Sequence, residues 1–422
     1  MTTLPDGYRT IVIGEDRKEE FLALDRLAFA WTADPAVDAQ VPFTVPLDRA
    51  MAVEGPSGRL AAVHGSYPFT LPVPGGGVPC AGLTWVGVRP DERRRGLLTS
   101  MIGTHVERSL GRGEPVSALF AAEQPIYGRF GYGCAADAVR LTLPRRAALR
   151  PVAGSDDLTV DLSTADPDRH EDLVDRLHAA AGAGRPGWLL RSTPALRRRI
   201  LVDPPQWRAG AEPMQLATVR APGGEPRGLA LLRRTPRWTE AGPEFTVEVL
   251  AALALDAPAT HRLWSFLLDL DLTATVSAPK LAVDDPLLQL LVDLRPGRPR
   301  LEDNLWVRLL DVPAALTGRR YAAPLDTVLE VTDALLPDNS GRWRLRTVDQ
   351  DHLGTWSLAV ERTDDAPALI TDVRELGAAY LGGRSLAALA AAGLVVEREP
   401  GAALRAAAAF GWPVAPLCSW TF

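Results

Sequence analysis

The sequence predicts a mixed α/β protein with two or three domains. Its 422 residues are too many for one ordinary domain of about 150 residues. Apolar residues make up 46% and charged residues 23% of the chain, which is typical of a soluble globular protein and excludes a disordered chain or a coiled coil. Along the first third of the chain the apolar pattern alternates between helical and strand spacing, and part of this order recurs weakly in the second third.

Clusters of Pro, Gly and Arg mark the candidate domain boundaries. One cluster covers residues 144–154, and the other is the Arg-Pro-Gly-Arg-Pro-Arg run at residues 295–300. These clusters predict three domains, which we place at residues 1–146, 147–298 and 299–422.

The first domain is predicted to contain a helix, a β-hairpin, a strand, a helix and a strand. The first helix covers residues 22–31, and the hairpin covers residues 51–65 with Gly-Pro-Ser-Gly at its turn. A buried strand over residues 82–88 is followed, after an arginine-rich loop, by a helix over residues 98–110. An apolar strand over residues 116–122 then precedes the segment Ile-Tyr-Gly-Arg-Phe-Gly-Tyr-Gly.

The second domain repeats part of this order weakly. The elements predicted there are a strand over residues 248–255, a loop over residues 256–262, a helix over residues 263–270 and a strand over residues 273–277. If the two strands are aligned, Thr260 and Leu263 fall where the first copy has Arg93 and Gly96, so the repeat keeps the fold pattern and loses the loop chemistry. A chance similarity between two apolar strands is the alternative interpretation.

Charge and cysteine content limit the classes of function. A net charge of −6 argues against nucleic-acid binding through a basic face. Lys18 and Lys280 are the only lysines, so arginine supplies nearly all of the positive charge. The three cysteines, Cys80, Cys134 and Cys418, are far apart, which indicates a reducing compartment and argues against a structural zinc site.

The sequence shows no targeting or metal-binding pattern. The N-terminal residues become charged before an apolar run develops, and the longest apolar run, residues 386–396, is too short for a membrane span. No metal-ligand spacing appears. We therefore expect a cytoplasmic protein that binds neither a membrane nor a metal.

The segment Arg93-Arg94-Arg95-Gly96-Leu97-Leu98 carries the clearest chemistry. It lies between a predicted strand and a predicted helix, where backbone N–H groups at the helix start face whatever occupies the loop. Glycine permits close approach of the backbone, and arginine adds charge-assisted hydrogen bonds to phosphate oxygens. The segment therefore predicts a cradle for an anion such as a pyrophosphate, although an arginine triplet before a helix is also typical of a solvated face.

The surrounding pattern resembles a known family. The pattern is V-x-V-x-P-x-x-R-R-R-G-L-L, with Ile-Tyr-Gly-Arg-Phe-Gly-Tyr about thirty residues later. It resembles the acetyl-CoA site of the GNAT superfamily of N-acetyltransferases, and Leu98 at its end departs from the usual small residue as in the enhanced intracellular survival (Eis) branch. The resemblance implies tandem GNAT folds, active in the N-terminal domain and degenerate in the central domain, and a C-terminal sterol-carrier-protein-like α/β domain.

The resemblance also implies roles for particular residues. Tyr127 would be the general acid that protonates the thiolate leaving group, with Tyr132 as its competitor. The C-terminal carboxylate of Phe422 would dock in the active site of the first domain and act as general base. The implied contacts with acetyl-CoA are backbone groups of Val86 and Val88 for the pantetheine arm, and Arg93, Arg94, Gly96, Leu97 and Leu98 for the pyrophosphate.

Three other residues are candidates on weaker grounds. Asp25 and Trp31 belong to the predicted first helix and could line a pocket for an amine, although solvated or packing roles are equally compatible. His105 lies on the apolar side of its predicted helix and is interpreted as a core histidine.

The predicted function is transfer of acetyl from acetyl-CoA to primary amines. The resemblance implies acceptors such as aminoglycoside-like molecules, polyamines or lysine side chains, and assembly as a homo-oligomer, a hexamer in that family. The alternative is a non-catalytic acyl-CoA sensor or lipid-binding protein.

Overall fold

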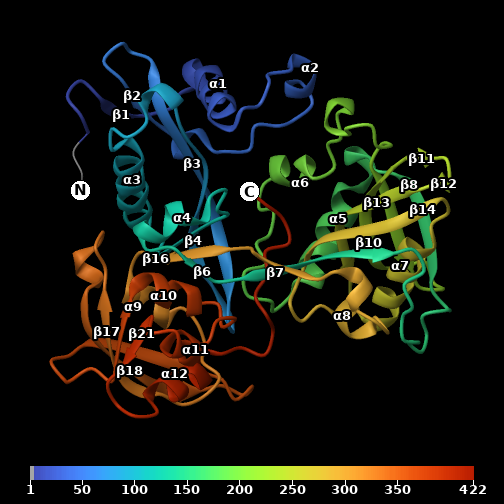
Figure 1. Cartoon of the computed structure of the whole chain (residues 1–422). Helices are drawn as coiled ribbons and strands as arrows, with labels where there is room; N and C mark the ends of the chain where they lie inside the picture. The colour runs from blue at the N-terminus through green and yellow to red at the C-terminus, as the bar shows by residue number, and fades with distance from the viewer. Residues whose placement is uncertain (1–3) are drawn as a thin grey trace.

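The chain folds around three main β-sheets (Figure 1). A computed structural model describes residues 4–422, apart from the side chain of Pro279. We call the parts built on these sheets the first, second and third units. In Figure 1 the first and third units form one half of the molecule and the second unit forms the other half. No helix among the described residues has the length and apolar character needed to cross a membrane.

The first unit contains a seven-stranded sheet with the spatial order β1-β2-β3-β4-β5-β16-β6. Its strands are β1 (Arg9–Val12), β2 (Met51–Glu54), β3 (Leu60–Val73), β4 (Gly76–Val88), β5 (Val116–Leu119), β6 (Gly133–Cys134) and β16 (Trp306–Leu309). Its helices are α1 (Lys18–Phe29), α2 (Pro35–Asp38), α3 (Leu97–Gly111) and α4 (Gln124–Tyr127). The predicted order of helix, hairpin, strand, helix and strand is confirmed, with β2 and β3 forming the hairpin.

The second unit contains another seven-stranded sheet with the order β15-β7-β14-β13-β10-β9-β8. Its strands are β7 (Asp137–Pro144), β8 (Thr159–Thr164), β9 (Gln215–Arg220), β10 (Pro226–Thr235), β13 (Phe245–Ala254), β14 (Thr273–Leu281) and β15 (Arg300–Asp303), with β11 (Trp238–Thr239) and β12 (Gly242–Pro243) as a separate ribbon. Its helices are α5 (Pro167–Ala181), α6 (Pro194–Arg199), α7 (Ala257–Asp269) and α8 (Pro286–Leu290).

The internal repeat is present as structure, but the predicted loop at residues 256–262 is wrong. The parallel strands β13 and β14 are joined by α7, as β4 and β5 are joined by α3. However, α7 begins at Ala257, because the Asp256 carboxylate accepts a hydrogen bond from the Ala259 N–H at 2.8 Å and caps the helix. Thr260 and Leu263 are therefore buried residues inside the helix and have no counterpart in the loop of the first unit.

The third unit contains a five-stranded sheet with the order β19-β18-β17-β20-β21. Its strands are β17 (Asp326–Thr332), β18 (Gly341–Gln350), β19 (Trp356–Arg362), β20 (Leu369–Asp372) and β21 (Val395–Glu397). Its helices are α9 (Val312–Thr317), α10 (Val373–Ala379), α11 (Leu386–Ala391) and α12 (Ala402–Phe410). One apolar core runs through the first and third units, with Phe21 and Leu71 from one and Leu329 and Phe410 from the other.

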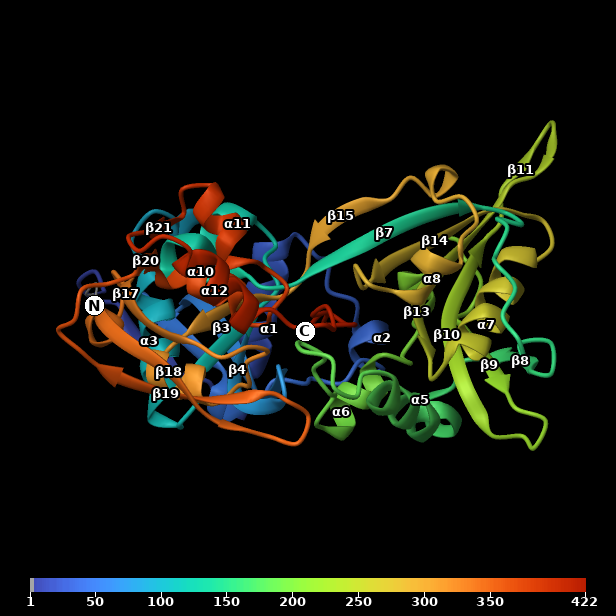
Figure 2. The ribbon, with the colours of Figure 1, turned by 90° about the horizontal axis from the view of Figure 1, so that it is seen from below.

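The sheets exchange strands near both predicted domain boundaries. β7 precedes residue 146 but pairs in the second sheet, and Figure 2 shows it leading from the first unit into the second. β16 follows residue 298 but pairs between β5 and β6 in the first sheet. Clusters of Pro, Gly and Arg indicate where the chain turns. They do not indicate which sheet the next strand joins, because a strand pairs with whichever sheet edge lies beside it.

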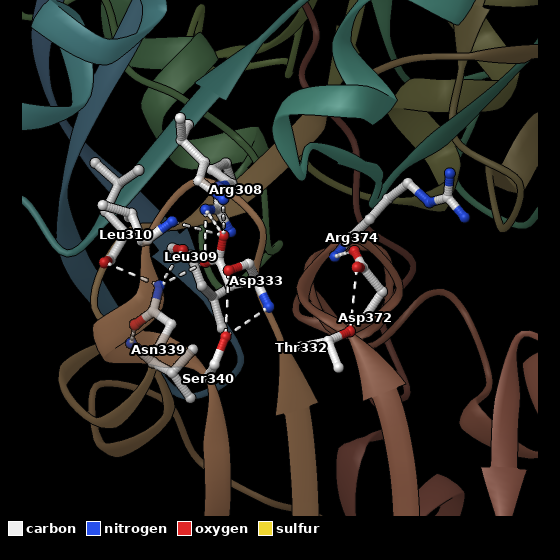
Figure 3. A network of polar contacts seen from close by, with 12 residues as sticks. Arg308, Leu309, Leu310, Thr332, Asp333, Asn339, Ser340, Asp372 and Arg374 are labelled. Carbon is white, nitrogen blue, oxygen red and sulfur yellow. Dashed lines mark hydrogen bonds and ion pairs between the residues drawn. The ribbon is translucent and has the colours of Figure 1, made fainter. Parts of the chain in front are cut away.

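A buried polar network joins the first and third units (Figure 3). Arg308 on β16 donates from Nη2 to both carboxylate oxygens of Asp333, at 2.7 and 2.6 Å, and the two side chains are 0% and 1% exposed. Asn339 donates from Nδ2 to Asp333 at 2.9 Å. Gly131 of the first unit lies directly against this guanidinium, since a Cβ added at Gly131 would come within 2.8 Å of Arg308 Cζ.

Candidate active site

The candidate site begins where β4 and β5 separate. The two parallel strands pair over residues 80–82 of β4 and residues 116–118 of β5. Beyond Gly82 no further pair joins them within the described residues, so the edge of β4 at residues 83–88 has no strand partner on that side. Unpaired N–H and C=O groups on such an edge can hydrogen-bond an extended ligand that carries amide groups.

A β-bulge alters the direction of this edge. His64 of β3 lies opposite two residues of β4, Trp85 and Val86. Trp85 has a φ of +54°, a left-handed conformation that is costly for a bulky residue. Its ring packs against Phe21 and Phe43, with ring centroids 5.9 and 5.5 Å away, and this packing stabilises the strained conformation.

A cavity of about 1030 Å³ lies at the separated strands. Five of the residues predicted from the sequence line it, namely Asp25, Trp31, Val86, Tyr127 and Phe422. Asp25 belongs to α1, Val86 to β4, Tyr127 to α4 and Phe422 to the C-terminus. Trp31 does not belong to the helix as predicted, because α1 ends at Phe29 and Ala30 follows in a left-handed conformation. The fold therefore brings together side chains from both ends of the chain, and in Figure 1 the C-terminus lies near the junction of the first and second units.

The predicted anion cradle lies at the start of α3. Gly96 precedes the helix with a φ of +78°, and Arg94 has a φ of +63°. No side chain caps the helix, and the first N–H groups of an α-helix have no partner within it. Arg93 and Arg94 are exposed, whereas Arg95 pairs with Glu92 at 3.2 Å. The loop therefore offers N–H groups, the positive end of a helix dipole and two exposed guanidinium groups to an anion.

The remaining cradle residues pack beneath the loop. Leu97 is buried, and Leu98 and Val88 are half-buried against the same small apolar cluster. Their side chains thus support the loop and the end of β4. The contact that the resemblance implies for Val88 is made by its backbone, whereas this packing involves its side chain.

The two candidate tyrosines lie in different surroundings. Tyr127 lines the cavity, whereas Tyr132 is fully buried and its hydroxyl lies 2.8 Å from Ser117 Oγ. Burial, and to a lesser extent the charge of Glu123, raises the pKa of Tyr127 to about 12, so this phenol is protonated at neutral pH. Ser117 Oγ also lies 2.9 Å from Nε2 of the buried His105, which confirms the predicted core role of that histidine.

The C-terminal segment is docked between the first and second units. The Cys418 N–H donates to Asn304 Oδ1 at 2.8 Å, and its carbonyl accepts from Asn304 Nδ2 at 3.0 Å. Trp420 donates from Nε1 to a backbone carbonyl of the second unit at 2.7 Å. Phe422 follows at the cavity, with its ring centroid 5.0 Å from that of Phe69.

Acidic side chains outnumber basic ones in the cavity lining. The acids are Glu19, Asp25, Asp34 and Asp38, and the bases are Lys18, Arg26 and Arg199. Arg26 pairs with Asp38 at 2.6 Å. Burial raises the pKa of Asp25 to about 6, against the opposing charges of Arg26 and Arg199. Sequence reasoning did not single out Arg199, because it lies on α6 of the second unit and no local pattern connects it with the first.

The described residues show free thiols and no metal cluster. Cys80 and Cys418 are buried, Cys134 is half-buried, and all three are unpaired. Residues 4–422 contain no group of three or more His, Cys, Asp or Glu residues that could hold a metal ion.

Comparisons with known proteins agree with this architecture. Residues 9–135 and residues 187–309 match acetyltransferase (GNAT) domain families, and residues 312–419 match a sterol carrier protein domain family. An uncharacterized N-acetyltransferase of Streptomyces coelicolor is 40% identical over 92% of this chain and 93% of its own length. N-acetyltransferase Eis of Mycobacterium tuberculosis is 33% identical over 90% of each chain. The chain belongs to the Eis-type N-acetyltransferases of the GNAT superfamily.

The crystal structure of Eis1 from Mycobacterium abscessus extends this similarity to three dimensions. It has a TM-score of 0.79 and 31% identity, and the match covers 98% of this chain and 100% of that one. The predicted fold class, two GNAT domains followed by a sterol-carrier-protein-like domain, is confirmed. GNAT acetyltransferases use acetyl-CoA as acyl donor, so membership in the Eis-type family makes this chain an acyltransferase.

The second unit of this Eis-type chain keeps the separated strands without the cradle. β13 and β14 pair over residues 245–248 and 273–277 and not beyond within the described residues. The connection between β13 and α7 consists of residues 255–256, whereas the connection between β4 and α3 consists of residues 89–96. The loop with arginine and glycine is therefore specific to the first unit.

Proposed function

We propose that this chain transfers acetyl from acetyl-CoA directly to a primary amine held in the cavity between β4 and β5. The observation that carries the proposal is that one cavity combines an unpaired strand edge, a protonated phenol and the C-terminus. The same strand, β4, leads through residues 89–96 to the uncapped start of α3. Holding both substrates in one site makes the reaction effectively unimolecular, and no covalent enzyme intermediate is needed.

The donor would bind along β4 and α3. Backbone groups of Val86 and Val88 would hydrogen-bond the pantetheine amides, since this edge has no strand partner. The pyrophosphate would occupy the cradle made by Arg93, Arg94, Gly96, Leu97 and Leu98, where N–H groups and the helix dipole favour an anion. A single site per chain follows, because the second unit lacks the loop.

Tyr127 is the proposed general acid. When the amine nitrogen attacks the thioester carbonyl carbon, a C–N bond forms and the C–S bond breaks, and the departing thiolate takes a proton. A phenol with a pKa of about 12 in the cavity is protonated at neutral pH and can donate it. Tyr132 is the poorer candidate, since its hydroxyl already contacts Ser117 inside the core.

The Phe422 carboxylate is the proposed proton acceptor. An amine with a pKa near 10 is mostly protonated at neutral pH and must lose a proton to react. The α-carboxylate is a weak base, so it would accept the proton through a water molecule or after desolvation. Packing of the Phe422 ring against Phe69 and Trp420 supports this placement of the chain end.

The proposed acceptors are small amines and lysine side chains, including aminoglycoside-like and polyamine molecules. The acidic excess of the cavity favours a cationic acceptor. Asp25, which is half-buried, and Trp31, which is 65% exposed, would contact it at the cavity mouth through charge and through the face of the indole.

A chain-end experiment tests the proposal. Two glycines added after Phe422 move the carboxylate and keep the ring, so we expect loss of most acetyl transfer with unchanged affinity for acetyl-CoA. The control is Phe422→Leu, which keeps a carboxylate at the same position and should retain more activity than the extended chain. Full activity in the extended chain would rule out a catalytic role for the carboxylate.

The alternative function is an acyl-CoA sensor or lipid-binding protein. It is supported by the sterol carrier protein match over residues 312–419, and a sensor would need neither a proton donor nor an acceptor. Release of free CoA in the presence of a polyamine, an aminoglycoside or a lysine-containing peptide distinguishes the two, because a sensor binds acetyl-CoA without releasing its thiol.

We also propose a cytoplasmic homo-hexamer, as the resemblance to the Eis family implies. Light scattering coupled to size-exclusion chromatography measures the mass of the assembly, and cell fractionation tests the location.

A further inference from the structure

A second cavity, inside the second unit, contains a buried arginine with unsatisfied nitrogens. The cavity has a volume of about 210 Å³ and is lined by the ends of β13 and β14 where these strands separate. Arg191 lines it and is only 4% exposed. Its Nε and Nη1 atoms are buried and hydrogen-bonded to none of the described residues. A buried charge without a partner is costly, so this site favours an anion from outside the chain.

The other charged groups around the cavity leave it positive. Lys280 lines it as well, and Arg185 is neutralised by an ion pair with Asp284 at 2.7 Å. Asp285 is the acid in the lining, and its carboxylate caps the start of α8. Asp175 lies near enough to favour the charged form of Arg191, but no ion pair joins these two residues among those described.

The C-terminal segment forms one wall of this cavity. Leu417 and Ser419 line it. Three successive residues contact its polar groups: Ser419 Oγ lies 2.8 Å from His178 Nε2, the Trp420 ring centroid lies 5.5 Å from the Arg191 guanidinium, and Thr421 Oγ1 accepts from Lys280 Nζ at 2.6 Å. The C-terminal segment therefore holds the side chains of Arg191 and Lys280 in position.

We propose that this cavity binds a small organic carboxylate, with the carboxylate at the unsatisfied nitrogens of Arg191 and the apolar body against Val249, Leu253 and Trp264. Mostly apolar walls with one cationic end suit a singly charged ligand, whereas a phosphate would place further charged oxygens against apolar carbon. A cavity of about 150 Å³ can hold benzene, so this one has room for a ring-sized body. The cavity is separate from the active-site cavity, although the C-terminal segment that forms its wall leads directly to Phe422.

Calorimetry on the full-length chain tests the site, with benzoate as the probe. We expect one benzoate per chain, with benzyl alcohol and inorganic phosphate binding at least tenfold more weakly. Arg191→Met should weaken benzoate binding at least tenfold. Arg237→Met, which changes an exposed arginine of the same unit, is the matched control and should leave benzoate affinity unchanged.

Several outcomes would overturn the proposal. These are no benzoate binding by the natural chain, equal binding by the Arg191→Met chain, equal binding of benzyl alcohol, or tighter binding of phosphate. If Arg191→Met does not fold, Arg191→Lys keeps a charge there and should weaken benzoate binding, since lysine is a point charge without the planar guanidinium; unchanged affinity would then count against the site.

Discussion

Replacing Gly131 with alanine should disturb the turn that carries Tyr127. Gly131 has a φ of +81°, its N–H donates to the Gly128 carbonyl at 3.0 Å, and the next residue, Tyr132, donates to the Tyr127 carbonyl at 3.3 Å. An alanine Cβ would come within 2.8 Å of Arg308 Cζ. That guanidinium is buried and held by two hydrogen bonds to Asp333 (Figure 3), so it has little room to move.

The size of the effect follows from two contributions. An alanine in the left-handed region costs about 1–2 kcal/mol. Separating a buried ion pair costs about 3–5 kcal/mol. Gly154→Ala isolates the first contribution, because Gly154 has a φ of +80° and a Cβ there would meet nothing within 4 Å. We expect Gly131→Ala to lower the free energy of unfolding by about 3 kcal/mol or more beyond Gly154→Ala.

Two measurements check this expectation. Urea unfolding followed by tryptophan fluorescence compares stability, and steady-state acetyl transfer compares kcat and the KM for acetyl-CoA. Gly131→Ala should lower kcat, because Tyr127 moves with the turn, and should leave the KM for acetyl-CoA nearly unchanged. If Gly131→Ala and Gly154→Ala lower the free energy of unfolding equally and have the same kcat, Arg308 does not constrain the turn.

Three further predictions concern the candidate active site. Gly96→Asp should abolish acetyl-CoA binding in calorimetry, because it places a side chain and a negative charge in the cradle; unchanged affinity would contradict the cradle. Tyr127→Phe should lower kcat by about 10²-fold or more with little change in acetyl-CoA affinity. Tyr132→Phe should change kcat only slightly. A large loss of kcat in Tyr132→Phe and a small one in Tyr127→Phe would make Tyr132 the general acid. Asp25 has a pKa of about 6 in the folded chain, above its usual value near 4, so the folded state binds its proton more tightly than the unfolded chain and this contribution to stability is lost as pH rises through 6. The Asp25 carboxyl group becomes negatively charged over the same pH range and can then attract a cation. The KM for a cationic amine should fall between pH 5 and 7 in the natural chain and stay nearly constant in Asp25→Asn. Parallel pH profiles of the two chains would exclude Asp25 as the partner of the amine.

The sequence predicted the local parts of the site better than the contacts between units. The strand, loop and helix around Gly96 follow from apolar spacing and from a glycine with a positive φ, and both signals are contained in neighbouring residues. α7 begins earlier than the sequence predicts, because the Asp256 side chain caps a helix at residues that also have the composition of a loop. Arg199, Arg308 and Lys280 could not be found in this way, since each acts on residues more than a hundred positions away in the chain or in another unit.

The candidate site depends on the whole chain for a topological reason. β16, which follows the second unit, pairs with both β5 and β6 and so completes the sheet that carries the cavity. Arg199 enters the cavity from the second unit, and Phe422 reaches it after the third. A fragment cut at residue 146 would keep the cradle but would leave β5 and β6 without the strand between them. The catalytic groups proposed here therefore belong to an assembly of all three units, and the boundaries of the sequence families do not delimit the functional site.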